Sequence, residues 1–239
     1  MLFRSLSKDE QLRIANSRSY ENLVAQRPVE RFMQEYFMHS SAIEDISRRF
    51  VARHRLRSIG ASFQRSLLTN RVARHYLLSP DELDIRRSSL VKVCKTLEDI
   101  VRIFHTAAMY RVRLSPAVTD RIKQVAQTLQ PDPTPEVGQL FMEILGATGR
   151  MAATIRAMHE TNVLELIIPE WKRVRCLLQF NQYHHYTVDE HTLLCLQICE
   201  NYAHDDSSVG DVYRNIKNKP ILHLSLLLHD AGKGYVEDH

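Results

Sequence analysis

Apolar residues recur at steps of three and four positions along most of this 239-residue chain. The clearest run begins at Pro28 and reaches about His54, with Phe32, Phe37 and Ile46 among its apolar positions. Such spacing lines one face of an α-helix, and proline is favoured in a helix's first turn. Only 7 glycines and 8 prolines occur, which argues against a turn-rich sandwich or barrel. The sequence therefore predicts an all-α fold, organised as a multi-helix array.

Further helices are expected where the same periodicity returns, at residues 90–109, 115–130, 135–145 and 150–160, with a helical turn at 163–168. Three prolines between Pro131 and Pro135 must interrupt any helix there. One short β-hairpin is possible near 72–85, turning at Ser79-Pro80-Asp81. Hydrophobic residues at 44% and charged residues at 25% are ordinary for a globular chain, so a disordered or fibrous class is excluded.

Charge and cysteine usage exclude several classes of function. A net charge of +4 is too small to predict nucleic-acid binding. An acid-free stretch between Ile46 and His75 is either a solvated face or an anionic docking surface; its arginines are Arg48, Arg49, Arg53, Arg55, Arg57, Arg65, Arg71 and Arg74. The four cysteines form no CxxC pair, and no signal peptide is present, so reduced thiols in the cytoplasm are expected. No apolar run approaches the ~20 residues that span a bilayer, which excludes membrane insertion.

The last third of the chain carries the strongest local signals. Thr187 and Glu190 fit a capping box, in which each side chain satisfies the other's backbone N–H, and they predict a helix that ends near Tyr202. A second, strongly apolar helix is expected from Pro220. His229 and Asp230 close that helix.

An adjacent imidazole and carboxylate at the end of a buried helix are costly unless a cation neutralises them. His191, on the preceding helix, would complete a set of three ligands with His229 and Asp230. Three protein ligands leave room for a water molecule, whose pKa a metal lowers to about 7, so the pattern is typical of a hydrolytic site. Lys233 stands at a glycine turn, where it could pair with a phosphate oxygen or a carboxylate.

The remaining histidines of the 12 need separate interpretations. His184 and His185 could reach across the start of the capped helix, as substrate-binding candidates, and His239 could return to the metal as a further ligand. A second His-Asp dipeptide, His204-Asp205, lies in a polar loop and is expected to be solvated. Surface or packing positions are expected for His39, His54, His75, His105, His159 and His223.

These residues resemble the HD superfamily of metal-dependent phosphohydrolases, whose pattern is H…HD…D. The stretch from Gln179 to Leu193 (QFNQYHHYTVDEHTL) and the stretch from Leu227 to Gly234 (LLHDAGKG) are similar to the bacterial PII uridylyltransferase/uridylyl-removing enzymes. The segments MHE at 158–160 and IPEW at 168–171 resemble the linker that precedes the HD domain in that family, and RFM at 31–33 resembles its earlier helical region.

The resemblance implies a bifunctional cytoplasmic enzyme of nitrogen regulation, which attaches UMP to a tyrosine of the PII signalling protein and removes it. It implies three regions: 1–65, a helical tail of the uridylyltransferase region; 66–182, a helical linker; and 183–239, the start of a truncated HD domain. His191, His229, Asp230 and His239 would bind Mg²⁺ or Mn²⁺, and His229, Asp230 and Lys233 would be catalytic. UMP and UTP would be its nucleotides, and neither nucleic acid nor a membrane is expected as a partner.

The chain also departs from the family pattern. It has no nucleotidyltransferase loop, no ACT region for glutamine sensing and no final aspartate of H…HD…D, so it is expected to be an internal piece of a longer protein. Asn181, Ala231 and Glu165 stand where the family has aspartate, isoleucine and glycine, and the changes at Asn181 and Glu165 are interpreted as surface substitutions.

Two other functions remain open at this stage. One keeps the metal but takes a free or cyclic nucleotide as substrate. The other is an inactive helical module that binds a protein partner through the arginine-rich stretch.

Overall fold

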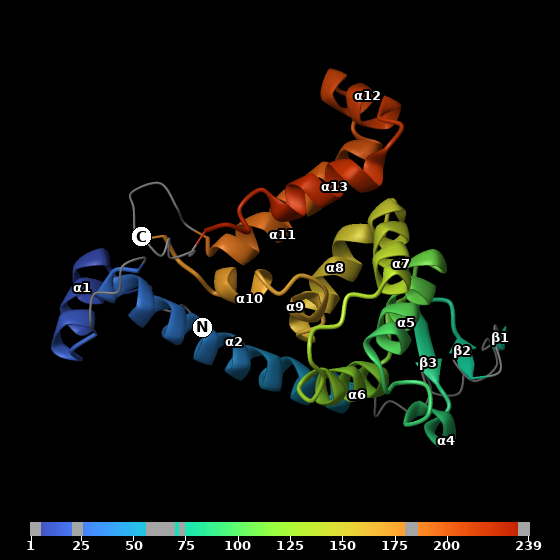
Figure 1. Cartoon of the computed structure of the whole chain (residues 1–239), viewed down its shortest axis with the longest axis horizontal. Helices are drawn as coiled ribbons and strands as arrows, with labels where there is room; N and C mark the ends of the chain where they lie inside the picture. The colour runs from blue at the N-terminus through green and yellow to red at the C-terminus, as the bar shows by residue number, and fades with distance from the viewer. Residues whose placement is uncertain (1–5, 21–25, 56–69, 72–74, 180–185, 234–239) are drawn as a thin grey trace.

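The computed structural model describes residues 6–20, 26–55, 70–71, 75–179 and 186–233. Helices dominate these residues, so the predicted fold class is confirmed (Figure 1). The helices are α1 (Lys8–Ser17), α2 (Pro28–Arg55), α4 (Arg87–Leu90), α5 (Leu97–Met109), α6 (Pro116–Ala126), α7 (Pro135–Gly146), α8 (Met151–Glu160), α9 (Leu164–Ile167), α10 (Trp171–Val174), α11 (Val188–Asn201), the 3₁₀ turn η1 (Tyr202–His204), α12 (Ser208–Asn215) and α13 (Lys219–Leu228). The predicted domain boundaries at 65/66 and 182/183 stay predictions.

One small sheet accompanies the helices. The predicted hairpin is present as antiparallel β2 (Tyr76–Leu78) and β3 (Glu82–Ile85), with Leu83 and Ile85 pointing into the core. Two strands that the sequence did not predict extend it: β1 (Asn70–Arg71) pairs with β2, and β4 (Arg113–Leu114) runs parallel to β3. Each has only two residues, too few to show the alternation that identifies a strand.

The main core lies between α5, α7 and α8, and the sheet covers one side of it (Figure 1). Its fully buried side chains include Ile100, Phe104, Ile144, Met151 and Ile155. Helix α13 packs against α7 and α11, and α11 packs in turn against α8. Since α11 and α13 carry His191 and lead to His229, this packing determines where the predicted ligands meet.

Helices α1 and α2 pack against each other, and ion pairs join the far end of α2 to α6 and α8 (Figure 1). Ala15, Val29 and Met33 make a small core of their own at the start of α2. Farther along the same helix, apolar Ile43 and Phe50 are exposed. The predicted helix at 28–54 is confirmed, and among its described side chains those in an apolar core come from its first half.

Two predicted helix boundaries are wrong. The helix expected at 90–109 begins only at Leu97, because Thr96 and Asp99 form a capping box there. Leu90 and Val93 still pack against the core from the preceding turn, which explains why their spacing resembled a helix. Helix α6 likewise ends at Ala126, before the predicted end near residue 130.

The predicted capping box at the start of α11 is also wrong. Thr187 occupies the N-cap position, but its side chain makes no capping hydrogen bond. Glu190 instead points toward α8 and accepts from Arg156 Nη1 through both carboxylate oxygens, each at 3.0 Å. Glu190 therefore pairs with Arg156 of α8 and not with the N-cap backbone that the local sequence predicted as its partner.

A second carboxylate of α11 also contacts α8. Glu200 Oε1 accepts from the backbone N–H groups of Gly149 and Met151, both at 2.8 Å, and Oε2 accepts from Ala152 N–H at 3.2 Å. A carboxylate is favourable at a helix N-terminus, and the N-cap residue Arg150 provides no side-chain cap of its own. Glu190 and Glu200 therefore hold opposite ends of α11 against α8.

Candidate metal centre

His191 and the His229-Asp230 pair come from two helices that pack together. His191 lies in the first turns of α11, and His229 is the C-cap residue of α13. Pro220 in the first turn of α13 and the apolar residues that follow give this helix its start and its packing face. The contact between α11 and α13 brings the end of one helix beside the beginning of the other.

The three side chains lie close enough to share one ion. One ligand atom from each of His191, His229 and Asp230 lies within 4.8 Å of the other two. The two imidazole rings are 5.6 Å apart between centroids and inclined by 59°. His229 Nε2 is 3.3 Å from Asp230 Oδ2. Their role as metal ligands stays a prediction, but the donor set of two imidazoles and one carboxylate fits a borderline divalent metal.

The hydrogen bond at the other nitrogen of His229 determines its tautomer. His229 Nδ1 lies 2.7 Å from the carbonyl oxygen of Leu226, an atom that can only accept, so Nδ1 is the donor. In the neutral ring the lone pair is then on Nε2, which faces Asp230. A backbone carbonyl holding the outer ring nitrogen is a common arrangement for metal-binding histidines.

Two further side chains border this cluster. Lys233 Nζ donates to Asp230 Oδ2 at 2.8 Å, so the lysine pairs with a carboxylate, one of the two partners predicted for it. Cys195, one turn after His191, places its Sγ 3.6 Å from His191 Nε2. Burial and the neighbouring Asp230 carboxylate raise the pKa of the Cys195 thiol, which favours its protonated form.

The other predicted site residues divide into two groups. His184, His185, Asn181 and His239 lie outside the described residues, as does most of the arginine-rich stretch. His204 is exposed at the end of η1, as expected for the second dipeptide. His223 is fully buried, 2.6 Å from the Leu145 carbonyl oxygen through Nδ1, so its packing role is confirmed.

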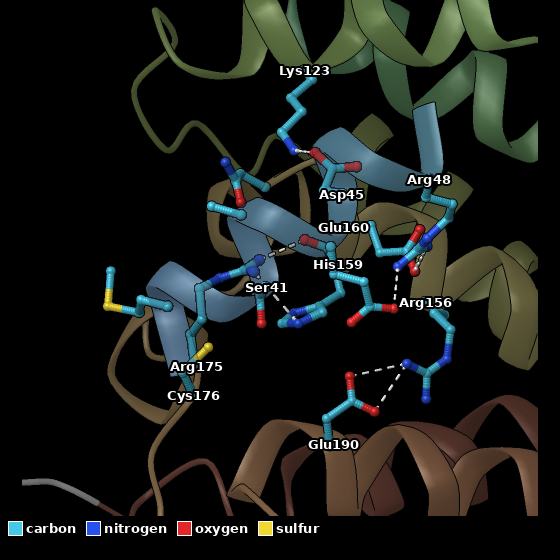
Figure 2. A pocket seen from close by; sticks show the side chains of 14 residues that line it. Ser41, Asp45, Arg48, Lys123, Arg156, His159, Glu160, Arg175, Cys176 and Glu190 are labelled. Carbon is cyan, nitrogen blue, oxygen red and sulfur yellow. Dashed lines mark hydrogen bonds and ion pairs between the residues drawn. The ribbon is translucent and has the colours of Figure 1, made fainter. Parts of the chain in front are cut away.

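A second polar region lies between α2, α8 and the start of α11, around a pocket of about 540 Å³ (Figure 2). Each cation that lines it is paired with a carboxylate. The pairs are Arg48 with Glu160, Lys123 with Asp45, Arg156 with Glu190, and Arg175 with Glu165. The prediction that Glu165 is a surface residue is therefore wrong: it is buried and neutralised by Arg175, which explains how a carboxylate is tolerated there.

This second region contains a histidine–aspartate pair that sequence reasoning missed. His159 Nε2 of α8 lies 3.5 Å from Asp189 Oδ2 of α11, and both side chains are buried. Burial, together with Arg175 and Arg156, lowers the pKa of His159 to about 3. A possible signal was present in the sequence, since Asp189 directly follows the first helical residue and precedes His191 by two positions.

The chain is thus a mostly helical protein with a candidate metal site where α11 and α13 meet. The chain is similar to bifunctional uridylyltransferase/uridylyl-removing enzymes of Cereibacter sphaeroides (30% identity over 98% of this chain), Azospirillum brasilense (31% over 97%) and Bradyrhizobium sp. (31% over 98%). No family model and no solved structure matches it.

Across nearly all of its residues, the chain therefore matches one part of the uridylyltransferase/uridylyl-removing enzymes. It spans about a quarter of the length of these curated relatives, 26% of the first two and 27% of the third. Among the described residues, no helix has the length and apolar character needed to cross a bilayer.

Proposed function

We propose that this chain carries the uridylyl-removing site of a bifunctional uridylyltransferase/uridylyl-removing enzyme. The substrate would be the phosphodiester that links UMP to a tyrosine of the PII signalling protein, and Mg²⁺ or Mn²⁺ would be the cofactor. The observation that carries the proposal is the meeting of His191, His229 and Asp230 from two helices. The names of the relatives supply the uridylyl group, and the sequence resemblance implies the tyrosine of PII that carries it.

His191, His229 and Asp230 would hold the metal. A bound divalent ion would polarise a phosphoryl oxygen and make water acidic enough to react near neutral pH. The Leu226 carbonyl fixes the His229 ring, so its Nε2 lone pair is available without reorientation. Side-chain exposures of 36% for His229 and 13% for Asp230 leave the cluster open to a protein-bound substrate.

Lys233 supplies a positive charge at the same carboxylate. Its ammonium group contacts Asp230 Oδ2, the oxygen that also faces His229, so the positive charge lies next to the candidate metal position. When a phosphodiester enters, this lysine can donate to a phosphoryl oxygen and balance the charge that develops on it. Lys233→Met is expected to slow hydrolysis about 10- to 100-fold, with a smaller effect on metal affinity.

The test is release of UMP from uridylylated PII. The protein with His229→Ala and Asp230→Ala together is expected to release UMP at least about 10³-fold more slowly, because the metal would lose two ligands. The chain offers a matched control in its second His-Asp dipeptide: His204→Ala with Asp205→Ala changes the same residue types outside the cluster. Undiminished release by the first double variant would overturn the proposal. Hydrolysis of free or cyclic nucleotides in preference to uridylylated PII would reassign the substrate.

A further inference from the structure

The first turn of α11 contains a buried carboxylate that the proposed hydrolysis does not use. Asp189 is 2% exposed and lies two residues before His191. Its Oδ2 accepts from the backbone N–H of Cys176 at 2.8 Å, and its Oδ1 accepts from the N–H of Glu190 at 3.0 Å. Asp189 therefore joins the start of α11 to the segment that follows α10.

His159 completes this attachment from α8. Trp171 Nε1 donates to His159 Nδ1 at 3.0 Å, so the proton of the neutral ring is on Nε2. That nitrogen faces Asp189 Oδ2 at 3.5 Å. Trp171 is 1% exposed, so the chain of contacts from Trp171 through His159 to Asp189 is buried.

A buried carboxylate is a costly way to hold a helix. Replacing such a group with an apolar residue is often neutral or stabilising, so its presence favours a role in specifying one geometry. The backbone supplies a parallel contact, since Val188 N–H donates to the Leu177 carbonyl at 2.8 Å. The contacts of Asp189 also set the rotation of the first turn of α11, because they hold the helix start against both Cys176 and His159.

The orientation of this helix start decides where His191 lies. Glu190 and Glu200 determine how α11 sits along α8, because they accept from Arg156 and from the backbone N–H groups at the start of α8. Asp189 acts from the buried side, half a turn or so before His191. A rotation of the first turn would move the imidazole away from His229 and Asp230, which belong to α13.

We propose that Asp189 is a positioning residue, which, by accepting a hydrogen bond from Cys176 N–H and by its contact with His159, holds the His191 imidazole opposite His229 and Asp230. The role rests on the proposed function, because it concerns the same cluster. Asp189 acts through α11 and contacts neither substrate nor metal.

The experiment compares two substitutions at one position. Asp189→Ala removes every contact of the carboxylate and is expected to weaken Mn²⁺ binding at least about tenfold by calorimetry, the scale of a lost supporting contact at a metal site. Asp189→Asn keeps an oxygen that can accept from Cys176 N–H, so it is expected to restore most of the affinity. In UMP release, Asp189→Ala is expected to lower kcat with little change in KM for uridylylated PII.

Ser115→Ala provides the matched control. Ser115 is also a buried polar residue at a helix start, donating to Asp84 at 2.7 Å and accepting from Val118 N–H at 3.2 Å, far from the cluster in the chain. It is expected to lower the melting temperature without changing Mn²⁺ affinity. If Asp189→Ala does not fold, Asp189→Ser replaces it, since it keeps a polar group at the helix start and shortens the side chain.

A metal-free readout separates this inference from the proposed function. The imidazole NMR resonances of His191 are expected to shift or broaden in Asp189→Ala and to stay unchanged in Ser115→Ala. Failure of the unsubstituted protein to bind Mn²⁺ or release UMP would refute the proposed function. The His191 resonances would still show whether Asp189 positions the His191 ring. Wild-type resonances and Mn²⁺ affinity in folded Asp189→Ala would overturn the inference. A loss in Asp189→Asn equal to that in Asp189→Ala would also overturn it, because charge rather than hydrogen bonding would then be required.

Discussion

Two histidine–aspartate pairs in this molecule have almost the same separation and opposite surroundings. His159 and Asp189 lie 3.5 Å apart with side-chain exposures of 8% and 2%. His229 and Asp230 lie 3.3 Å apart with exposures of 36% and 13%. In the buried pair, Trp171 donates to the outer nitrogen of His159, and the backbone N–H groups of Cys176 and Glu190 donate to the two oxygens of Asp189. In the exposed pair, the outer nitrogen of His229 contacts a carbonyl and the inner atoms face His191 and Lys233.

The partners of such a pair, rather than its residue types or its separation, decide what it can do. A pair whose atoms are all engaged inside the protein stabilises one arrangement of the chain. A pair with a free lone pair, a neighbouring imidazole and access to solvent can take a cation. Helix α11 joins the two, since it carries both Asp189 and His191.

The largest expected effect is on the free energy of unfolding, which should fall much more when the buried pair is broken than when the exposed pair is broken. His159→Ala is expected to lower the free energy of unfolding by about 3 kcal/mol, because it leaves Trp171 Nε1 and the Asp189 carboxylate short of a partner in the core. His229→Ala, at a partly exposed helix end, is expected to change it by less than about 0.5 kcal/mol. Urea denaturation followed by circular dichroism measures both, and equal losses would remove the distinction.

The exposed pair is expected to respond to metal. Mn²⁺ at about 100 times its dissociation constant should raise the free energy of unfolding by about 2.7 kcal/mol, because it binds only the folded cluster. A chelator should reverse the effect. Thermal unfolding of His191→Ala provides the check: this variant should show no metal-dependent rise, whereas His159→Gln should retain one if the buried pair takes no metal.

The buried pair is expected to respond to acid. His159 has a pKa of about 3 in the folded protein, because of burial and of Arg175 and Arg156, against an unfolded value near 6.5. Its contribution is therefore present above about pH 6.5 and is lost as the pH falls toward 3, since only the unfolded chain binds the proton. The slope approaches about 1.4 kcal/mol per pH unit, or about 2 kcal/mol between pH 6 and 4.5.

His159→Gln isolates this pH dependence. The groups that face the ring are Trp171, Asp189, Arg175 and Arg156, and none of them is changed in this variant. Burial also lowers the pKa of His223, so part of the slope is expected to remain. Urea denaturation at a series of pH values compares the two proteins, and an unchanged slope in the variant would contradict the low pKa of His159.

The sequence predicted the exposed pair and missed the buried one for a physical reason. His229 and Asp230 are adjacent in the chain and follow an apolar helix, so a local pattern contains most of the information. His159 and Asp189 are thirty residues apart, and only the packing of α11 on α8 brings them together. The fold class was predictable because helical periodicity is local, whereas β4 depends on pairing with β3, and the burial of Glu165 depends on an ion pair with Arg175, which lies outside its own helix.

The smallest expected effect concerns how the shared helix begins. Thr96 accepts from Asp99 N–H at 3.1 Å, so Thr96→Val should lower the free energy of unfolding by about 1 kcal/mol. Thr187 makes no capping hydrogen bond, and Asp189 holds the start of α11 instead, so Thr187→Val should cost less than about 0.5 kcal/mol. The two variants exchange the same atoms, so urea denaturation compares the caps directly. A loss at Thr187 as large as that at Thr96 would mean that α11 is held by its cap, and the buried pair would then have less influence on the position of His191.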